Sequence, residues 1–300
     1  MHEEFTIYRF AIEDVLSQHR IEIKDIKLHF CPRVYQFKIF LAHGGKAAKV
    51  LALEDELTQA LGVSSIRMVR MDDCIAVEVP IRKGGGVSIS VMMTRNAFYE
   101  SKARLPLALG ATWGMKIRAI DLADAPHLLV AGASGQGRDM FLKGVRACLD
   151  AKSPDARQVW IDTTAKDADM VGIAARLEGL CDEMERRLRS DEALPYIIVI
   201  VNEYAPLVVC RWTYRSIIRL AQNGHRAGIH FILATQRPSR DVITMLIKSN
   251  FPTRIAFKVS TKSDSLLILD EAGAEKLLGT GDMLFLWGGR VERIQGPTID

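Results

Sequence analysis

A glycine-rich turn in the middle of the chain has residue types and spacing suited to holding phosphate. It runs Gly132-Ala133-Ser134-Gly135-Gln136-Gly137-Arg138-Asp139, between the apolar stretch HLLVA and the apolar helical stretch MFLKGVRACL. The glycines at 132 and 137 match the phosphate-binding loop G-x-x-x-x-G-K-[ST]. In that loop, backbone N–H groups curl around phosphate at a helix N-terminus, and glycine permits the required backbone angles. We therefore predict a nucleotide-binding site over residues 132–139.

Two positions of this loop carry residues that change its chemistry. Arg138 stands where the pattern has lysine, and Asp139 stands where it has the serine or threonine that binds magnesium. Arginine keeps the charge, but its planar fork does not reproduce a compact ammonium between phosphates. A carboxylate about 4 Å from a phosphate charge is repelled by roughly 1 kcal/mol in water and about 4 kcal/mol at intermediate dielectric. Mg²⁺ bound to Asp139 would offset part of this, so we expect weakened nucleotide binding.

A second apolar stretch, YIIVIV, ends in Asn202-Glu203. A strand that ends in Asp-Glu is typical of ATPases in which the aspartate helps hold Mg²⁺ and the glutamate polarises the attacking water. Here asparagine replaces the aspartate, so the site loses one carboxylate at 202 and gains one at 139. We expect the ends of the two strands to lie side by side, with Asp139 accepting a hydrogen bond from Asn202. Such an exchange conserves charge without restoring the metal geometry.

The elements that must position these residues change character along the chain. Before residue 105, stretches such as IEIKDIKLHF and RVYQFKIFL alternate apolar and polar residues around the helical segment AKVLALEDELTQALG, and a flexible turn is predicted at Lys83-Gly84-Gly85-Gly86. Later, nearly continuous apolar runs alternate with helical stretches, as in parallel sheets buried on both faces. We predict a small α+β domain over 1–105 and an α/β domain with a mostly parallel central sheet over 106–300.

Composition narrows the classes of function. The formal net charge of +4 over 300 residues is too small to indicate a nucleic-acid partner. The five cysteines are scattered and odd in number, which favours reduced thiols in a cytoplasmic protein over a disulfide framework. No apolar run approaches the roughly 20 residues that span a bilayer, and the N-terminus lacks the pattern of a signal peptide. We expect contact with a membrane only through a separate partner or a segment outside this chain.

Longer motifs resemble the FtsK/SpoIIIE family of DNA translocases over almost the whole chain. They are PHLLVAG, LPYIIVIVNEYAPL and RLAQNGHRAGIHFILATQRPSRDVITMLIKSNFPTRIAFKVSTKSDSLLILDEAGAEKLLGTGDMLF, and PRVYQFKIFLAHGGKAAKVLALEDEL resembles the small domain that precedes the motor domain. The resemblance implies a RecA-like P-loop NTPase domain, ATP and Mg²⁺ as cofactors, and a hexameric ring that threads double-stranded DNA. We expect the winged-helix domain that reads orientation sequences in some members to be absent.

The resemblance also assigns residues that contact DNA and nucleotide. Arg237, Lys248 and Lys262 correspond to family residues that touch the DNA backbone. Contacts of this kind give affinity and register without reading sequence. Gln236 and Asn202 join the loop residues 132–139 as nucleotide-binding residues, and Asp139 is the candidate magnesium ligand.

Positions that act between subunits depart from the family pattern. His225 stands where the family has the arginine that reaches the neighbouring subunit's nucleotide, and Leu266 replaces a second arginine. Arg226 is the candidate for a displaced arginine finger. A shift of one helical position turns a side chain by about 100°, and an arginine finger can contribute three or more decades in rate. Glu203 is the candidate catalytic acid if the site is active.

These departures concentrate at the nucleotide interface, whereas the glycine turns, strand cores and DNA-facing cations remain. We predict a DNA-binding ring subunit with impaired or absent ATP hydrolysis, a pseudoenzyme, in a homo-oligomer or in a hetero-ring with an active paralogue. The alternatives are a slow but active ATP-driven translocase that uses Arg138 and Glu203, and a regulatory subunit of a protein-secretion or assembly ATPase. Without a triphosphate, Arg138 is expected to pair with Asp139, Glu203 or Asp162.

Overall fold

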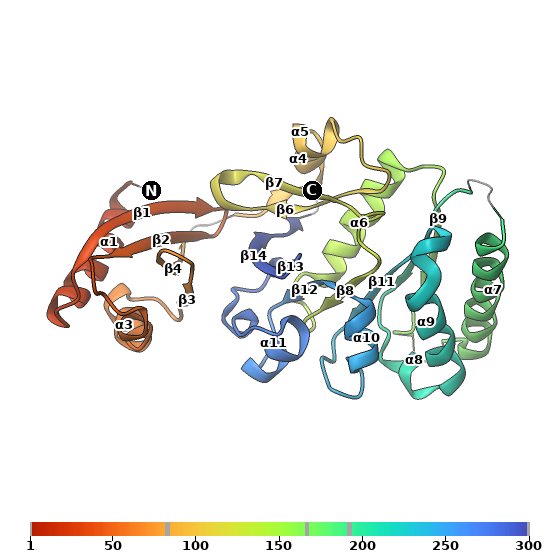
Figure 1. Cartoon of the computed structure of the whole chain (residues 1–300). Coiled ribbons are helices and arrows are strands. Elements are labelled where there is room, and N and C mark those ends of the chain that lie inside the picture. Colours follow the sequence, from red (N-terminus) through yellow and green to blue (C-terminus); the bar gives the residue numbers. More distant parts are fainter. Residues whose placement is uncertain (1, 82–84, 166–167, 191–193, 299–300) are drawn as a thin grey trace. The chain divides into compact units, whose positions relative to one another are not determined.

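A computed structural model describes residues 2–81, 85–165, 168–190 and 194–298 (Figure 1). The chain forms two compact units: Met1–Gly86 with Thr112–Lys116, and Val87–Ala111 with Ile117–Asp300. The domain boundary predicted at residue 105 falls inside the second unit, and it stays a prediction. Lys83 and Gly84 of the predicted turn lie outside the described residues. No helix in the described ranges has the length and apolar character that crossing a membrane requires.

The first unit is a four-stranded antiparallel sheet with order β1-β2-β4-β3, packed against helices. Its core holds Ile12 and Leu16 of α1, Phe37 of β2 and Leu57 of α3. Its elements are α1 (His2–Gln18), β1 (Ile23–Cys31), β2 (Val34–Leu41), α2 (Ala47–Leu51), α3 (Glu54–Leu61), β3 (Arg67–Arg70), β4 (Ile75–Pro80) and η1 (Trp113–Met115).

The second unit is an α/β domain built on a nine-stranded sheet. Its elements are β5 (Val87–Ser88), α4 (Ile89–Met93), α5 (Asn96–Tyr99), β6 (Pro106–Ala111), β7 (Ile117–Asp121), β8 (Leu128–Ala131), α6 (Arg138–Lys152), β9 (Arg157–Ile161), α7 (Met170–Leu188), β10 (Ile197–Val201), α8 (Ala205–Val209), α9 (Arg211–Asn223), η2 (Gly224–Ala227), β11 (Ile229–Thr235), α10 (Met245–Asn250), β12 (Thr253–Phe257), α11 (Lys262–Leu269), η3 (Ala274–Lys276), β13 (Asp282–Trp287), β14 (Arg290–Gln295) and β15 (Pro297–Thr298).

The strand order of the large sheet is β7-β6-β14-β13-β12-β8-β11-β10-β9. The five strands from β12 to β9 are parallel, which confirms the predicted α/β class, and the other four extend the sheet as antiparallel strands. The expectation that the ends of β8 and β10 lie side by side is wrong, because β11 lies between them and pairs with both. Crossover connections decide strand order, and the apolar patterns of single strands do not encode it.

Alternate residues of β10 explain why its sequence is apolar throughout. Ile197, Val199 and Val201 join a core that includes residues of α7 and α9, whereas Ile198 and Ile200 join a separate core that includes Phe141 of α6. Successive side chains of a strand point to opposite faces of a sheet, so both sets are buried only when helices cover both faces. The covered sheet holds the carboxyl ends of β8, β10 and β11 in fixed positions.

Candidate functional site

The glycine-rich turn joins β8 to α6 in the conformation that its glycines permit. Gly135 and Gly137 have φ angles of 74° and 116°, a region that side chains with a Cβ rarely adopt. A Cβ at Gly137 would lie 2.4 Å from the backbone nitrogen of Gly281. The N–H of Gly281 donates to the carbonyl oxygen of Gln136 at 2.8 Å. The turn before β13 therefore packs directly on the loop at Gly137, where a side chain would clash with the turn.

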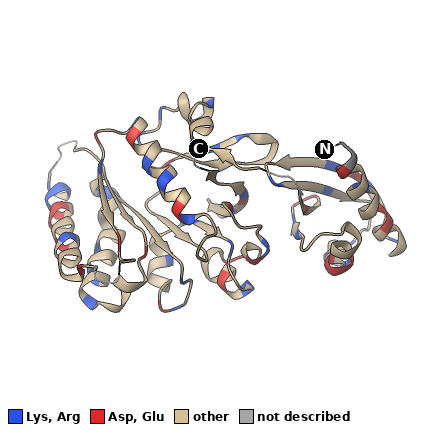
Figure 2. Ribbon diagram, turned by 180° about the vertical axis from the view of Figure 1, so that it is seen from behind, with Lys and Arg blue, Asp and Glu red and all other residues tan. Residues whose placement is uncertain are grey.

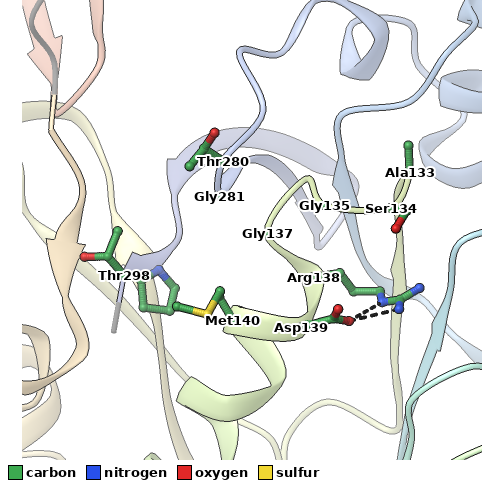
Figure 3. A pocket seen from close by; sticks show the side chains of 11 residues that line it. Ala133, Ser134, Gly135, Gly137, Arg138, Asp139, Met140, Thr280, Gly281 and Thr298 are labelled. Atoms are coloured by element: carbon green, nitrogen blue, oxygen red, sulfur yellow. Dashed lines mark hydrogen bonds and ion pairs between the residues drawn. The ribbon is translucent and has the colours of Figure 1, made fainter. Parts of the chain in front are cut away.

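A cavity of about 310 Å³ opens beside this loop (Figure 3). Six of the predicted nucleotide-binding residues line it: Ala133, Ser134, Gly135, Gly137, Arg138 and Asp139. Gly132, Gln136, Asn202 and Gln236 are not among its lining residues. The lining also includes five residues that the sequence analysis did not predict: Met140, Thr280, Gly281, Pro297 and Thr298. The cavity size and the glycine turn fit a phosphate-containing ligand.

Arg138 is buried between two carboxylates, as predicted for Asp139 and Glu203. Its Nη2 and Nε lie 2.9 and 3.2 Å from Asp139 Oδ1, and its Nη1 lies 3.4 Å from Glu203 Oε2. The Arg138 side chain is only 4% exposed, whereas that of Asp139 is 64% exposed. Figure 3 shows the guanidinium turned toward the Asp139 carboxylate. The cation in the loop is therefore neutralised within the chain.

The Glu203 carboxylate is fully engaged in hydrogen bonds. Oε1 accepts from the Thr235 hydroxyl at 2.6 Å and from the Ala205 N–H at 3.1 Å. Oε2 accepts from the Gln236 N–H at 2.6 Å and from Arg138 at 3.4 Å. Thr235 ends β11 and Gln236 follows it, so the strand that intervenes between β8 and β10 and the residue after it supply two of the four donors. To accept a proton or orient water, this carboxylate must release one of them.

Asn202 faces Asp162 rather than Asp139. Hydrogen bonds from Thr164 lower the pKa of Asp162, and the Asn202 side chain adds to this shift. Asn202 Oδ1 is buried and has no hydrogen-bond partner among the described residues. The predicted hydrogen bond from Asn202 to Asp139 is therefore wrong. The physical reason is that the neighbouring guanidinium of Arg138 holds the Asp139 carboxylate.

The donor set does not match a preformed magnesium site. The one carboxylate on the loop, Asp139, is paired with Arg138. Within the described ranges, no three His, Cys, Asp or Glu side chains gather where they could hold a metal ion. Mg²⁺ is usually bound through one or two carboxylates together with water and substrate phosphates. As arranged, these residues fit a phosphate better than they fit the metal.

The two candidates for subunit contacts, His225 and Arg226, lie on η2 with exposed side chains. Neither lines the cavity beside the loop. The ring of His225 lies 6.3 Å from that of His127. His127 is buried, with Nδ1 accepting from the Phe231 N–H and Nε2 placed to donate to the Ala221 carbonyl, both at 2.9 Å. Burial lowers the pKa of His127 to about 3, so this histidine is a neutral packing residue.

The three candidate DNA-binding cations differ in their surroundings. Arg237 and Lys262 are exposed, on the segment after β11 and at the first turn of α11. Lys248 on α10 is 12% exposed, and its Nζ lies 2.6 Å from Asp270 Oδ1. Asp270 also binds Arg254 at 2.7 Å. Burial would raise the pKa of Asp270, but hydrogen bonds from Lys248 and Arg254 lower it overall. Lys248 therefore has a structural partner, whereas the side chains of Arg237 and Lys262 form no ion pair with any residue that the structure describes.

Two family models match parts of the chain. The FtsK alpha domain matches residues 2–81, and the FtsK/SpoIIIE family matches residues 184–240. DNA translocase FtsK 2 of Neisseria meningitidis is 35% identical over 98% of this chain, and DNA translocase SpoIIIE of Bacillus subtilis is 33% identical over 96%. The aligned regions cover 35% and 43% of those relatives, so the chain spans well under half of their length.

Solved structures share the fold at lower sequence identity. The conjugation coupling protein TcpA superposes with a TM-score of 0.67 at 20% identity, covering 99% of this chain and 96% of that chain. The type VII secretion ATPase EccC of Thermomonospora curvata has a TM-score of 0.59 at 15% identity, covering 72% of this chain and 33% of that one. These likenesses establish a P-loop ATPase fold. The sequence identities above 30% along nearly its whole length show that the chain belongs to the FtsK/SpoIIIE family.

Proposed function

We propose that this chain is a duplex-DNA-binding subunit of a translocase ring whose nucleotide site binds ATP weakly and hydrolyses it slowly or not at all. The observation that carries the proposal is the buried Arg138 side chain held between Asp139 and Glu203. These contacts engage both the Arg138 guanidinium, which would bind phosphate, and the Glu203 carboxylate, which would polarise water. ATP would have to break these contacts in order to bind and react.

The first consequence concerns binding. For Arg138 to contact ATP phosphates, its guanidinium must leave two carboxylates. One of these, Glu203, is itself nearly buried. Breaking one side of a buried ion pair leaves an uncompensated charge in a site of reduced dielectric. The exposed Asp139 would then face the triphosphate, and like charges about 4 Å apart repel by roughly 4 kcal/mol at an effective dielectric of 20.

The second consequence concerns hydrolysis. Glu203 holds the backbone N–H groups of Ala205 and Gln236, so it ties the segment after β10 to the segment after β11. A carboxylate that already accepts four hydrogen bonds must lose one of these donors before it can orient a water molecule. Its arrangement supports a structural role. The alternative of a slow translocase rests on the retention of this residue.

DNA binding is supported by the family relationship and by two exposed cations. Relatives of this chain are DNA translocases by name. Arg237 and Lys262 project from the segment after β11 and from α11, where they are accessible to a phosphate backbone. Contacts of this kind are independent of base sequence and weaken with salt. Lys248 contributes indirectly, by fixing Asp270 beside α10.

The assembly follows from the same proposal. We place the chain in a ring, hexameric by analogy with the family, either of identical subunits or beside an active paralogue that supplies hydrolysis. ATP with Mg²⁺ is the expected nucleotide, and double-stranded DNA is the expected partner. The free cysteines fit a reducing compartment, which we propose is the cytoplasm.

An ATPase assay with and without duplex DNA tests the proposal. We expect no DNA-stimulated turnover by the unaltered chain, measured beside an active FtsK-type motor. The combined change Arg138→Lys, Asp139→Ser and Asn202→Asp should be necessary for any recovery, and adding His225→Arg should be needed for DNA stimulation. Turnover by the unaltered chain at motor rates would show that Arg138 and Glu203 are catalytically competent.

A further inference from the structure

A basic pocket in the first unit lies outside the nucleotide site. It encloses about 210 Å³ between the end of α1, the start of β1 and the turn that joins β2 to α2. Three positively charged residues line it: Arg20, Lys46 and Lys49. The lining also contains His43, Glu22 and the glycine pair Gly44 and Gly45. With histidine neutral, the lining carries three positive charges and one negative charge.

The cations of this basic pocket are free to bind a ligand. Arg20, Lys46 and Lys49 are exposed, and none has a hydrogen bond or ion pair from its side chain to another residue in the part of the chain that the structure describes. Like charges that converge on a concave surface raise the local positive potential and concentrate anions there. Figure 2 shows basic and acidic residues interspersed along the ribbon of α7, and Arg186 and Arg187 of this helix form ion pairs with Glu183. In the basic pocket, three cations accompany a single carboxylate, Glu22.

The backbone around Arg20 departs from the usual local rule. The N–H of Arg20 donates to Ser17 and that of Ile21 donates to Leu16, which is the hydrogen-bond pattern that ends a helix at a left-handed residue. Arg20 occupies the left-handed position with φ 55°. Glycine is preferred there because it has no Cβ to strain. An arginine at this position costs the helix end some stability, and its side chain lines the basic pocket.

The turn opposite Arg20 is shaped by its two glycines. Gly44 has φ 84°, and a Cβ at Gly45 would lie 2.7 Å from Leu41 Cβ. The N–H of Gly45 donates to Ala42, and the N–H of Ala42 donates to Glu22. These contacts bring His43 and Lys46 to the same side as Arg20. The glycines thus create the concave wall of the basic pocket.

We propose that the basic pocket binds a phosphate group, and that in the DNA complex this group is a phosphodiester of the duplex backbone. The second half of the proposal rests on the proposed function. The pocket volume accommodates one tetrahedral oxyanion with its hydration. Guanidinium and ammonium groups supply the donors that such an anion prefers. Glu22 is the opposing charge, which keeps the affinity for a single phosphate modest and reversible.

Four variants of the full chain test the pocket, with binding of inorganic phosphate followed by phosphorus NMR. Lys46→Ala with Lys49→Ala should weaken phosphate binding about tenfold, and Glu22→Gln should strengthen it about threefold, since each exposed charge contributes a modest amount. Arg20→Gly should weaken phosphate binding while raising the thermal unfolding midpoint, because it relieves the left-handed strain. Lys24→Ala, at an exposed lysine of β1 outside the pocket, is the matched control and should change neither property.

Anisotropy of a labelled duplex, measured over a range of salt, tests the DNA half. The double lysine variant should reduce the slope of log affinity against log salt by about 2, as expected for two lost phosphate contacts. If none of the three pocket variants changes phosphate binding, the proposed site is wrong. Arg20 would then only interact with the dipole at the C-terminus of its helix. If the double lysine variant has the same slope of log affinity against log salt as the Lys24→Ala control, the pocket does not contact DNA. If the unaltered chain binds no duplex at all, the proposed function fails, while the phosphate measurements still decide the pocket.

Discussion

Arg138 Nη1 lies 3.4 Å from Glu203 Oε2, and this contact joins the helix after β8 to the end of β10 across the intervening strand β11. The two residues are 65 positions apart in the sequence. In a working ATPase of this fold, the corresponding groups would both face the nucleotide. Here they face each other. Each of the two charges therefore has a partner within the chain.

The Arg138–Glu203 contact should contribute to stability. Arg138→Met should lower the free energy of unfolding by about 2 kcal/mol, less than the full cost of breaking a buried pair because Glu203 keeps three other donors. Urea denaturation measures this. Combining it with Glu203→Gln should give a coupling of about 1 kcal/mol or more. Arg189→Met, at an exposed ion pair with Glu185, is the control and should have no measurable effect. Equal effects at 138 and 189 would contradict the prediction.

Gly137 should not tolerate a side chain. Gly137→Ala should destabilise the second unit by about 2 kcal/mol or more, because φ 116° strains an alanine and its Cβ would clash with the Gly281 backbone. Gly179→Ala is the matched control, since Gly179 lies in α7 with nothing within 4 Å of a new Cβ. That change should stabilise by up to about 1 kcal/mol. Opposite signs in thermal unfolding are the expected result, and a neutral Gly137→Ala would show that the loop is not held as described.

Lys248 should differ from the exposed cations Arg237 and Lys262 in its effects on duplex binding and on the free energy of unfolding. Arg237→Ala with Lys262→Ala should weaken duplex binding at every sequence alike and reduce the salt slope by about 2, with no change in stability. Lys248→Ala should lower the free energy of unfolding by about 1 kcal/mol, because it removes one of the two partners of Asp270. If Lys248→Ala leaves the free energy of unfolding unchanged but greatly weakens duplex binding, the result would show that the lysine leaves Asp270 to bind phosphate.

Stability should decline as pH falls from about 6.5 toward 5. Burial lowers the pKa of His127 to about 3 and also lowers that of His230. Both stay neutral in the folded chain while the unfolded chain takes up protons below its usual histidine pKa of about 6.5. Each histidine therefore costs up to about 1.4 kcal/mol per pH unit in this window. Urea denaturation at several pH values measures the slope.

A His127→Gln variant checks the assignment of this pH dependence. It should have a smaller slope between pH 6.5 and 5, since one of the two titrating groups is gone. Above about pH 7.5, residue 127 is neutral in both the folded and the unfolded chain. The variant and the unaltered protein should therefore differ in stability by an amount that does not depend on pH. An unchanged slope in the variant would assign the pH dependence to other groups.

The sequence alone determined the local features of this protein. The spacing of Gly132 and Gly137 after an apolar strand predicted the loop, because glycine acts on its own backbone. The continuous apolar run at β10 predicted a strand covered on both faces, and the expected pairing of Arg138 with Asp139 joins adjacent residues. The helix α1 was not predicted, and the single helix expected before Gly62 is two helices, α2 and α3. Both errors concern the first unit, where α1, α2 and α3 contribute Ile12, Val50 and Leu57 to one core.

Only the tertiary structure decided which distant segments complete the sites. Thr280, Pro297 and Thr298 line the cavity from far along the chain, and Thr235 reaches Glu203 because β11 lies between β8 and β10. Lys248 could not be distinguished from Lys262 by its motif, since the difference is an ion pair to Asp270. Crossover order and through-space charge pairing involve residues that are remote in sequence. Their energies depend on distance in the folded chain, which no local pattern records.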